Sequence, residues 1–167
     1  MEYYGDPKAK IVFIALGSVV GTIKDTVDQL NAEGKKAAVV KVKVFRPFPG
    51  EELRKALVHA QFVAVIDKSV SLGSEGILAQ EVRPTVGSKC HVQSFVAGLG
   101  GRDITRKQLL GVYKTVQKKQ NKTVKQTTSE LRSGEQLDVN GNPIDPKRKY
   151  LGKRLKVPFL SADSDFY

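Results

Sequence analysis

Cysteine is nearly absent from this chain, which has one, Cys90, among its 167 residues. A single cysteine excludes an internal disulfide and any zinc or iron–sulfur site built from several thiolates of the chain itself. We expect Cys90 to be a buried, inert thiol. Histidine is also scarce, and His59 and His91 have no metal-ligand spacing to a cysteine or carboxylate. The sequence therefore predicts no metal site.

Long apolar runs are absent as well. No segment approaches the ~20 consecutive apolar residues that a membrane-spanning helix needs. The first residues, Met1 to Asp6, lack the basic and then apolar pattern of a signal peptide. From these two absences we expect a cytoplasmic protein with no membrane partner.

Positive charge is abundant, with 28 Lys and Arg against 17 Asp and Glu and a net charge of +11. Clustered basic residues would predict nucleic-acid binding through phosphate contacts. The basic residues are instead spread along the chain, which favours solvated helix faces over a nucleic-acid groove. An acidic protein partner or an anionic cofactor would explain the excess equally well.

Apolar strands alternate with amphipathic helices over residues 11–116. The runs typical of strands are Ile11–Leu16, Ala37–Val44, Phe62–Ile66 and Val92–Val96, and each is followed by apolar residues at helical spacing. Pro84 should kink or end the third helix, and Thr105 with Gln108 forms a capping box for the fourth. This alternation predicts an α/β fold with a doubly wound, mostly parallel sheet.

The pattern ends after residue 116. Between residues 117 and 149 the few apolar residues cannot bury enough surface to fold as a unit. We therefore divide the chain into an α/β domain, residues 1–116, and a basic, partly disordered and extended C-terminal arm, residues 117–167. Apolar residues return at Val157–Leu160, and we interpret the arm as packing on a partner.

If the strands are parallel, the four turns that follow them lie at the carboxyl edge of one sheet, where such sheets place ligand or partner sites. Arg46 follows the second strand and either forms an interdomain ion pair, which we favour, or binds a carboxylate or phosphate through two parallel hydrogen bonds. Phe48, flanked by prolines, is either core or an interface anchor. Asp67, at the end of the third strand, either caps a helix or belongs to the same polar edge.

The fourth turn, Gly98-Leu99-Gly100-Gly101-Arg102-Asp103, resembles a dinucleotide fingerprint but has Asp103 where the third glycine is required. We expect its glycines to permit positive φ or close backbone approach, and Arg102 and Asp103 to form an ion pair that holds the turn. The candidate interface residues of the chain are therefore Arg46, Phe48, Asp67, Gly100, Gly101, Arg102 and Asp103.

Six segments together, in this order, carry a family resemblance: Glu2-Tyr3-Tyr4, Ala15–Ser18, Arg46–Pro49, Val65–Ser71, Gly73–Gly76 and Gly98–Asp103. They resemble the second domain of the alpha subunit of pyruvate:ferredoxin oxidoreductase, also called 2-oxoacid:ferredoxin oxidoreductase or pyruvate synthase. The resemblance covers residues 2 to about 116 and implies a transketolase C-terminal-like fold. Lys68 stands where the family usually has Arg, and the span 117–149 looks like an insertion.

The resemblance implies a multisubunit enzyme that decarboxylates a 2-oxoacid oxidatively, forms an acyl-CoA and reduces ferredoxin. It implies thiamine diphosphate, magnesium, iron–sulfur clusters and CoA for the whole enzyme, but no cofactor or catalytic residue in this chain. The partners would be the thiamine-binding and iron–sulfur domains or subunits, with ferredoxin as an indirect partner. The role implied for this chain is non-catalytic assembly, and we expect the isolated chain to be inactive.

A second hypothesis comes from a different class of proteins. The chain would be a stand-alone α/β binding module that uses the same sheet edge for an anionic ligand. Its basic arm would then recruit an acidic partner or RNA.

Overall fold

The computed structural model describes residues 1–133, and the side chains of residues 1–121. The strands are β1 (Glu2–Gly5), β2 (Ile11–Leu16), β3 (Ala37–Val42), β4 (Phe62–Asp67) and β5 (His91–Val96). The helices are α1 (Val19–Ala32), α2 (Gly50–Ala56), α3 (Ile77–Val86) and α4 (Arg106–Ser133), with short 3-10 turns η1 (Gly87–Lys89) and η2 (Leu99–Gly101). The chain divides into two compact units, and residues 1–116 belong to the first.

The sheet has five strands in the order β1-β3-β2-β4-β5. Strands β2, β3, β4 and β5 are parallel, and β1 pairs antiparallel with β3. The predicted α/β fold with a mostly parallel sheet is thereby confirmed. Strand β1 was not predicted, because this four-residue edge strand is only partly buried and has no long apolar run.

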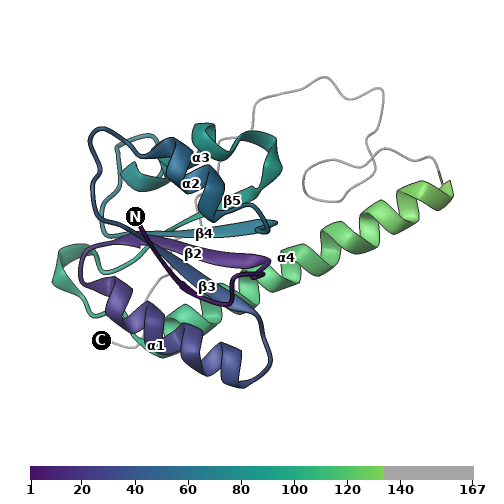
Figure 1. Ribbon diagram of the computed structural model, residues 1–167, viewed down its shortest axis with the longest axis horizontal. Coiled ribbons are helices and arrows are strands. Elements are labelled where there is room, and N and C mark those ends of the chain that lie inside the picture. Colours follow the sequence, from purple (N-terminus) through teal and green to yellow (C-terminus); the bar gives the residue numbers. More distant parts are fainter. Residues whose placement is uncertain (134–167) are drawn as a thin grey trace, which may run out of the picture. The chain divides into compact units, whose positions relative to one another are not determined.

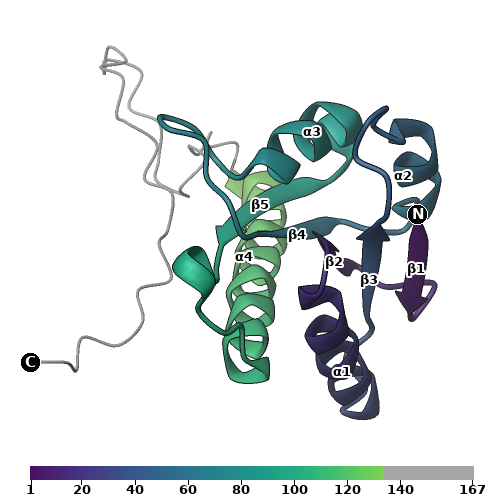
Figure 2. The ribbon, with the colours of Figure 1, turned by 90° about the vertical axis from the view of Figure 1, so that its left-hand side faces the viewer.

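Helices cover both faces of the sheet: α1 and the first part of α4 lie on one face, and α2 and α3 on the other (Figure 1 and Figure 2). Each face has its own core. Phe13 packs with Leu30 and Tyr113 on one side, while Ile14 packs with Leu53 and Leu78 on the other. Successive residues of β2 thus enter different cores, which explains why the strand is apolar without interruption.

Helix α3 ends where the sequence predicts, and helix α4 is longer than predicted. Pro84 lies inside α3, which ends soon after it at Val86. Helix α4 continues beyond residue 116 to Ser133, because the Lys and Gln residues that follow Val116 are good helix formers even without an apolar stripe. The arm from residue 134 to residue 167 lies outside the described residues. No helix of the described part has the length and apolar character needed to cross a membrane.

The capping box at the start of α4 is confirmed. The Thr105 backbone N–H donates to Gln108 Oε1 at 2.8 Å, and the Gln108 backbone N–H donates to Thr105 Oγ1 at 3.3 Å. These reciprocal bonds satisfy two backbone donors that a helix start leaves free. They fix where α4 begins after the loop that leaves β5.

Glu2 gives the folded state a pH dependence. Its carboxylate pairs with Lys24 of α1 and with Lys43, and the hydrogen bond to Lys24 contributes most to lowering the pKa of Glu2 from 4.5 to about 2. A carboxylate whose pKa is lower in the folded state stabilises that state above pH 4.5, and this contribution disappears as the pH falls toward 2.

We therefore expect Glu2→Gln to lower the urea midpoint of unfolding at pH 7, and the difference from the parent to vanish as the pH approaches 2. Glu51→Gln is the control, because Glu51 is exposed and has no ion pair within the described residues. A difference that persists at low pH would show that Glu2 acts through packing instead of charge.

Candidate functional site

The loops that follow the four parallel strands lie at one edge of the sheet, as predicted. We call residues 16–18, 43–49, 68–77 and 97–103 the carboxyl-edge surface. Because β2 and β4 lie between β3 and β5, the loop with Arg46 and the glycine-rich turn occupy opposite ends of this surface. The loops after β2 and β4 lie between them.

Exposed apolar side chains gather on this surface. Leu16, Val44, Val70, Leu72 and Ile77 are 38%, 55%, 39%, 102% and 43% exposed, respectively. They are five of the six large hydrophobic residues that are exposed in the described part of the chain. Exposed apolar side chains concentrated on one edge of a domain are typical of sites of protein association. The arrangement therefore suits packing against another protein surface.

None of these five residues was predicted as a site residue from the sequence. Leu16 ends an apolar strand, a position that favours the core, although its side chain is exposed. Leu72 and Val70 offered a usable signal, because these two aliphatic residues stand among serines, glycines and charged residues in one loop.

Arg46 forms an ion pair within the domain, with Glu81, and not the interdomain pair that was favoured from the sequence. Its Nη2 donates to Glu81 Oε1 of α3 at 2.8 Å, and its guanidinium carbon lies 4.3 Å from the centre of the Phe45 ring. The Arg46 side chain is still 61% exposed. One edge of the guanidinium is thus fixed to the domain while much of the group faces solvent.

Phe48 is half-buried and packs against the core on the α2–α3 face. Its ring meets that of Phe45 edge to face, with 6.1 Å between the ring centres. This contact lies within the loop, and both rings pack against the same core, which attaches the loop to the domain. The inner side of Phe48 is therefore part of the core and its outer side faces solvent, while its role as an interface anchor stays a prediction.

Asp67 caps a helix. Its side chain is buried, and Oδ2 accepts the Leu78 backbone N–H at 2.6 Å near the start of α3. Oδ1 accepts the Ser69 hydroxyl at 2.9 Å. A Cβ at Gly76 would lie 2.7 Å from the Asp67 Cβ, so this close approach requires glycine. Asp67 thereby fixes both ends of the loop that carries Leu72.

A bidentate ion pair holds the same loop from the other side. Arg83 of α3 donates from Nε and Nη2 to the two carboxylate oxygens of Glu75, at 2.8 and 2.7 Å. The hydrogen bonds to Glu75 raise the pKa of Arg83. The loop between β4 and α3 is therefore positioned by charged contacts, although its apolar residues face solvent.

The glycine-rich turn after β5 has the backbone conformation predicted for it. Gly98, Gly100 and Gly101 have φ values of +73°, +66° and +80°, which side chains other than glycine rarely adopt. Arg102 and Asp103 are exposed, and the expected ion pair between them is absent from the described residues. Adjacent residues in an extended segment direct their side chains apart, which explains why that prediction was wrong.

Metal-binding and thiol chemistry have little support in this part of the chain. In the described range, no three His, Cys, Asp or Glu side chains gather where they could hold a metal ion. Cys90 is buried, as predicted, and burial raises the pKa of its thiol.

Comparison with known proteins identifies the family to which the chain belongs. The model of the pyruvate:ferredoxin oxidoreductase core domain II matches residues 9–109. The chain belongs to this family. It is 40% identical over 105 residues to pyruvate synthase subunit PorA of Methanothermobacter thermautotrophicus, and the match covers 63% of this chain. It is 41% identical over 107 residues to ketoisovalerate oxidoreductase subunit VorA of Pyrococcus furiosus, with 62% of this chain covered.

Each of these matches spans 27% of the relative's own length. The matched region therefore corresponds to about a quarter of each of those subunits. The 2-oxoglutarate:ferredoxin oxidoreductase from Magnetococcus marinus shares the fold, with a TM-score of 0.56 and 22% identity. That likeness covers 68% of this chain and 19% of the solved one.

Proposed function

We propose that this chain is a non-catalytic assembly domain of a 2-oxoacid:ferredoxin oxidoreductase, and that its carboxyl-edge surface docks on the rest of the enzyme. The proposal rests on five exposed apolar side chains at one edge of a domain that belongs to the core domain II family: Leu16, Val44, Val70, Leu72 and Ile77. Relatives have about three quarters of their length outside the matching region. That additional polypeptide is available to cover the exposed apolar edge.

The two ends of the surface would add specificity to this contact. Arg46 presents an exposed guanidinium at one end, and Gly100, Gly101, Arg102 and Asp103 present polar backbone and charge at the other. Apolar centres flanked by polar rims are typical of protein interfaces. Phe48 supports the first end, and Asp67 acts from within by positioning the central loop.

The whole enzyme would decarboxylate a 2-oxoacid on thiamine diphosphate with magnesium, pass electrons through iron–sulfur clusters to ferredoxin, and release an acyl-CoA. Those groups would be held by the partner domains or subunits. The family membership supports this assignment, and the single buried cysteine is consistent with clusters located elsewhere. Relatives named for pyruvate and for ketoisovalerate match about equally well, so either 2-oxoacid suits the proposal.

Within this proposal, residues 1–116 are the assembly domain and residues 117–167 are a basic arm that supplements it. The family match ends at residue 109, before the arm begins. The arm would therefore add contacts particular to this chain.

Reconstitution tests the proposal. The other subunits of the enzyme from the same source would be co-expressed with and without this chain, and 2-oxoacid-dependent reduction of a viologen dye measured. We expect the chain to co-purify with the thiamine-binding part and dye reduction to require it. Full activity of the remaining subunits without this chain would overturn the assembly role.

Arg46→Ala should weaken association more than it weakens folding. Loss of an exposed ion pair costs under about 1 kcal/mol of stability, whereas truncating an interface arginine costs about 2 kcal/mol of binding. Glu81→Gln is the matched control, because it removes the same ion pair and leaves the guanidinium in place. Equal loss of association in both variants, measured by biolayer interferometry, would mean that Arg46 has only a structural role.

A further inference from the structure

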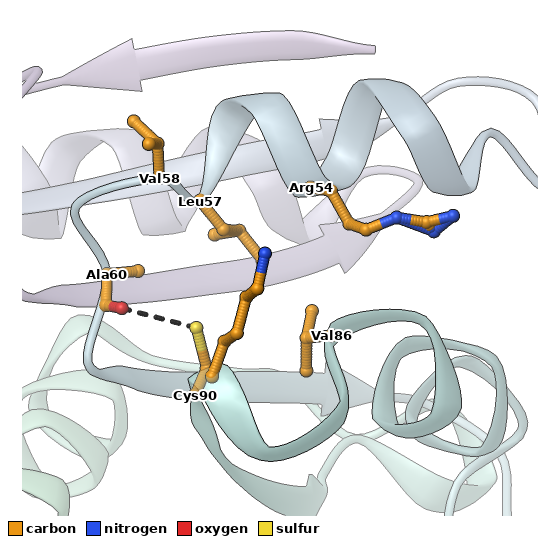
Figure 3. Close-up of a pocket in the computed structure, with 7 residues that line it drawn as sticks. Arg54, Leu57, Val58, Ala60, Val86 and Cys90 are labelled. Atoms are coloured by element: carbon orange, nitrogen blue, oxygen red, sulfur yellow. Dashed lines mark hydrogen bonds between the residues drawn. The ribbon is translucent and has the colours of Figure 1, made fainter.

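A pocket of about 390 Å³ opens at the amino edge of the sheet, the edge opposite the carboxyl-edge surface. It is lined by Arg54, Leu57, Val58, Ala60, Val86, Lys89 and Cys90, which come from the ends of α2 and α3 and from the turns after them. Figure 3 shows Leu57, Val86 and Cys90 around a common space. Its volume lies within the usual range for small-molecule sites.

The floor of the pocket is apolar. Leu57 and Val86 are almost fully buried, and Ala60 and Cys90 are each 8% exposed. The Cys90 thiol donates to the Ala60 carbonyl at 3.2 Å, so its hydrogen-bonding capacity is used within the protein (Figure 3). Val58 stands at the opening and is 72% exposed. A hydrocarbon group placed on this floor would therefore displace water from apolar surface.

The rim is cationic. Arg54 on α2 and Lys89 on η1 are exposed, and neither is paired with a carboxylate in the described part of the chain. No acidic side chain is among the lining residues. Two unneutralised cations beside an apolar floor favour a ligand with one anionic group and a hydrocarbon body.

We propose that this pocket binds a small amphipathic anion, with a short aliphatic chain on the floor of Leu57, Val86 and Cys90 and a carboxylate between Arg54 and Lys89. The inference does not depend on the proposed assembly function. The site lies at the other edge of the sheet, away from the carboxyl-edge surface.

Cys90 provides a reporter for the test, since it is the chain's single thiol and lines the pocket. In the full chain, we would measure alkylation of Cys90 by N-ethylmaleimide during titration with hexanoate. Because only the free protein reacts, hexanoate at about nine times its Kd should slow alkylation about tenfold. Hexanol, which lacks the charge, should slow alkylation no more than about twofold at the same concentrations, and acetate, which lacks the chain, should have little effect. Methyl NMR shifts of Leu57 and Val86 report occupancy independently of the thiol.

Variants locate the anionic group. Arg54→Gln and Lys89→Gln should each raise the half-saturating hexanoate concentration about threefold, the effect of one exposed charge pair. Lys55→Gln removes the same charge from α2 at a position that does not line the pocket, and should leave binding unchanged. Equal protection by hexanol, no methyl shifts at millimolar hexanoate, or an equal effect of Lys55→Gln would each overturn the proposal.

Discussion

Leu72→Asp is expected to abolish association with the rest of the oxidoreductase while leaving the folding of the chain unchanged. The Leu72 side chain is 102% exposed, so the folded domain loses no packing when it is replaced. In an apolar interface the new carboxylate would be buried without a partner, at a cost above the ~2 kcal/mol that marks an interface hot spot. A cost of that size weakens binding by more than about thirtyfold.

Val58→Asp is the matched control for this experiment. Val58 is also a largely exposed aliphatic residue, 72% exposed, but it lies at the amino edge of the sheet. Thermal melts and binding to the immobilised partner subunits would be measured for both variants. Equal loss of binding by Val58→Asp, or normal binding by Leu72→Asp, would contradict a docking surface at the carboxyl edge.

Asp67→Ala should lower the free energy of unfolding by about 2 kcal/mol or more, because removal of a buried charged acceptor leaves its donors unsatisfied. These donors are the Leu78 backbone N–H and the Ser69 hydroxyl. Asp103→Ala, which changes an exposed aspartate on the same surface, should cost less than about 0.5 kcal/mol. Urea unfolding of the isolated chain measures both changes.

The result also decides how Asp67 contributes to the interface. If it positions the loop between β4 and α3, stability and association should fall together. Unchanged stability with lost association would instead mean that Asp67 contacts the partner directly, although its carboxylate points into the domain.

The fold could be predicted from the sequence because its strands are buried on both faces. Continuous apolar runs such as Ile11–Leu16, followed by helical stripes, are typical of a parallel sheet covered by helices on both sides. β1 escaped prediction because it is short, lies at an edge and pairs antiparallel with β3. The extension of α4 to Ser133 escaped because lysine-rich sequence gives no amphipathic pattern, although it favours helix locally.

The candidate site was less accessible to sequence reasoning. Strand parallelism placed the four turns at one edge correctly, and the positive φ of the Gly98 turn followed from its composition. Exposure of Leu16 or Ile77 could not be predicted, since an apolar residue at the end of an element is usually core. Asp67 could be assigned as a helix cap only from its hydrogen bond with the backbone N–H of Leu78, a residue eleven positions away.

Solvent accessibility of the carboxyl-edge surface in the assembled enzyme tests the central claim most directly. Hydroxyl-radical footprinting of this chain, alone and bound to the other subunits, would compare labelling of Leu16, Val44, Leu72 and Ile77 with that of Val58. The account predicts strong protection of the first four residues on assembly and unchanged labelling of Val58. An assembled enzyme in which Leu72 and Ile77 remain as reactive as in the free chain would contradict it.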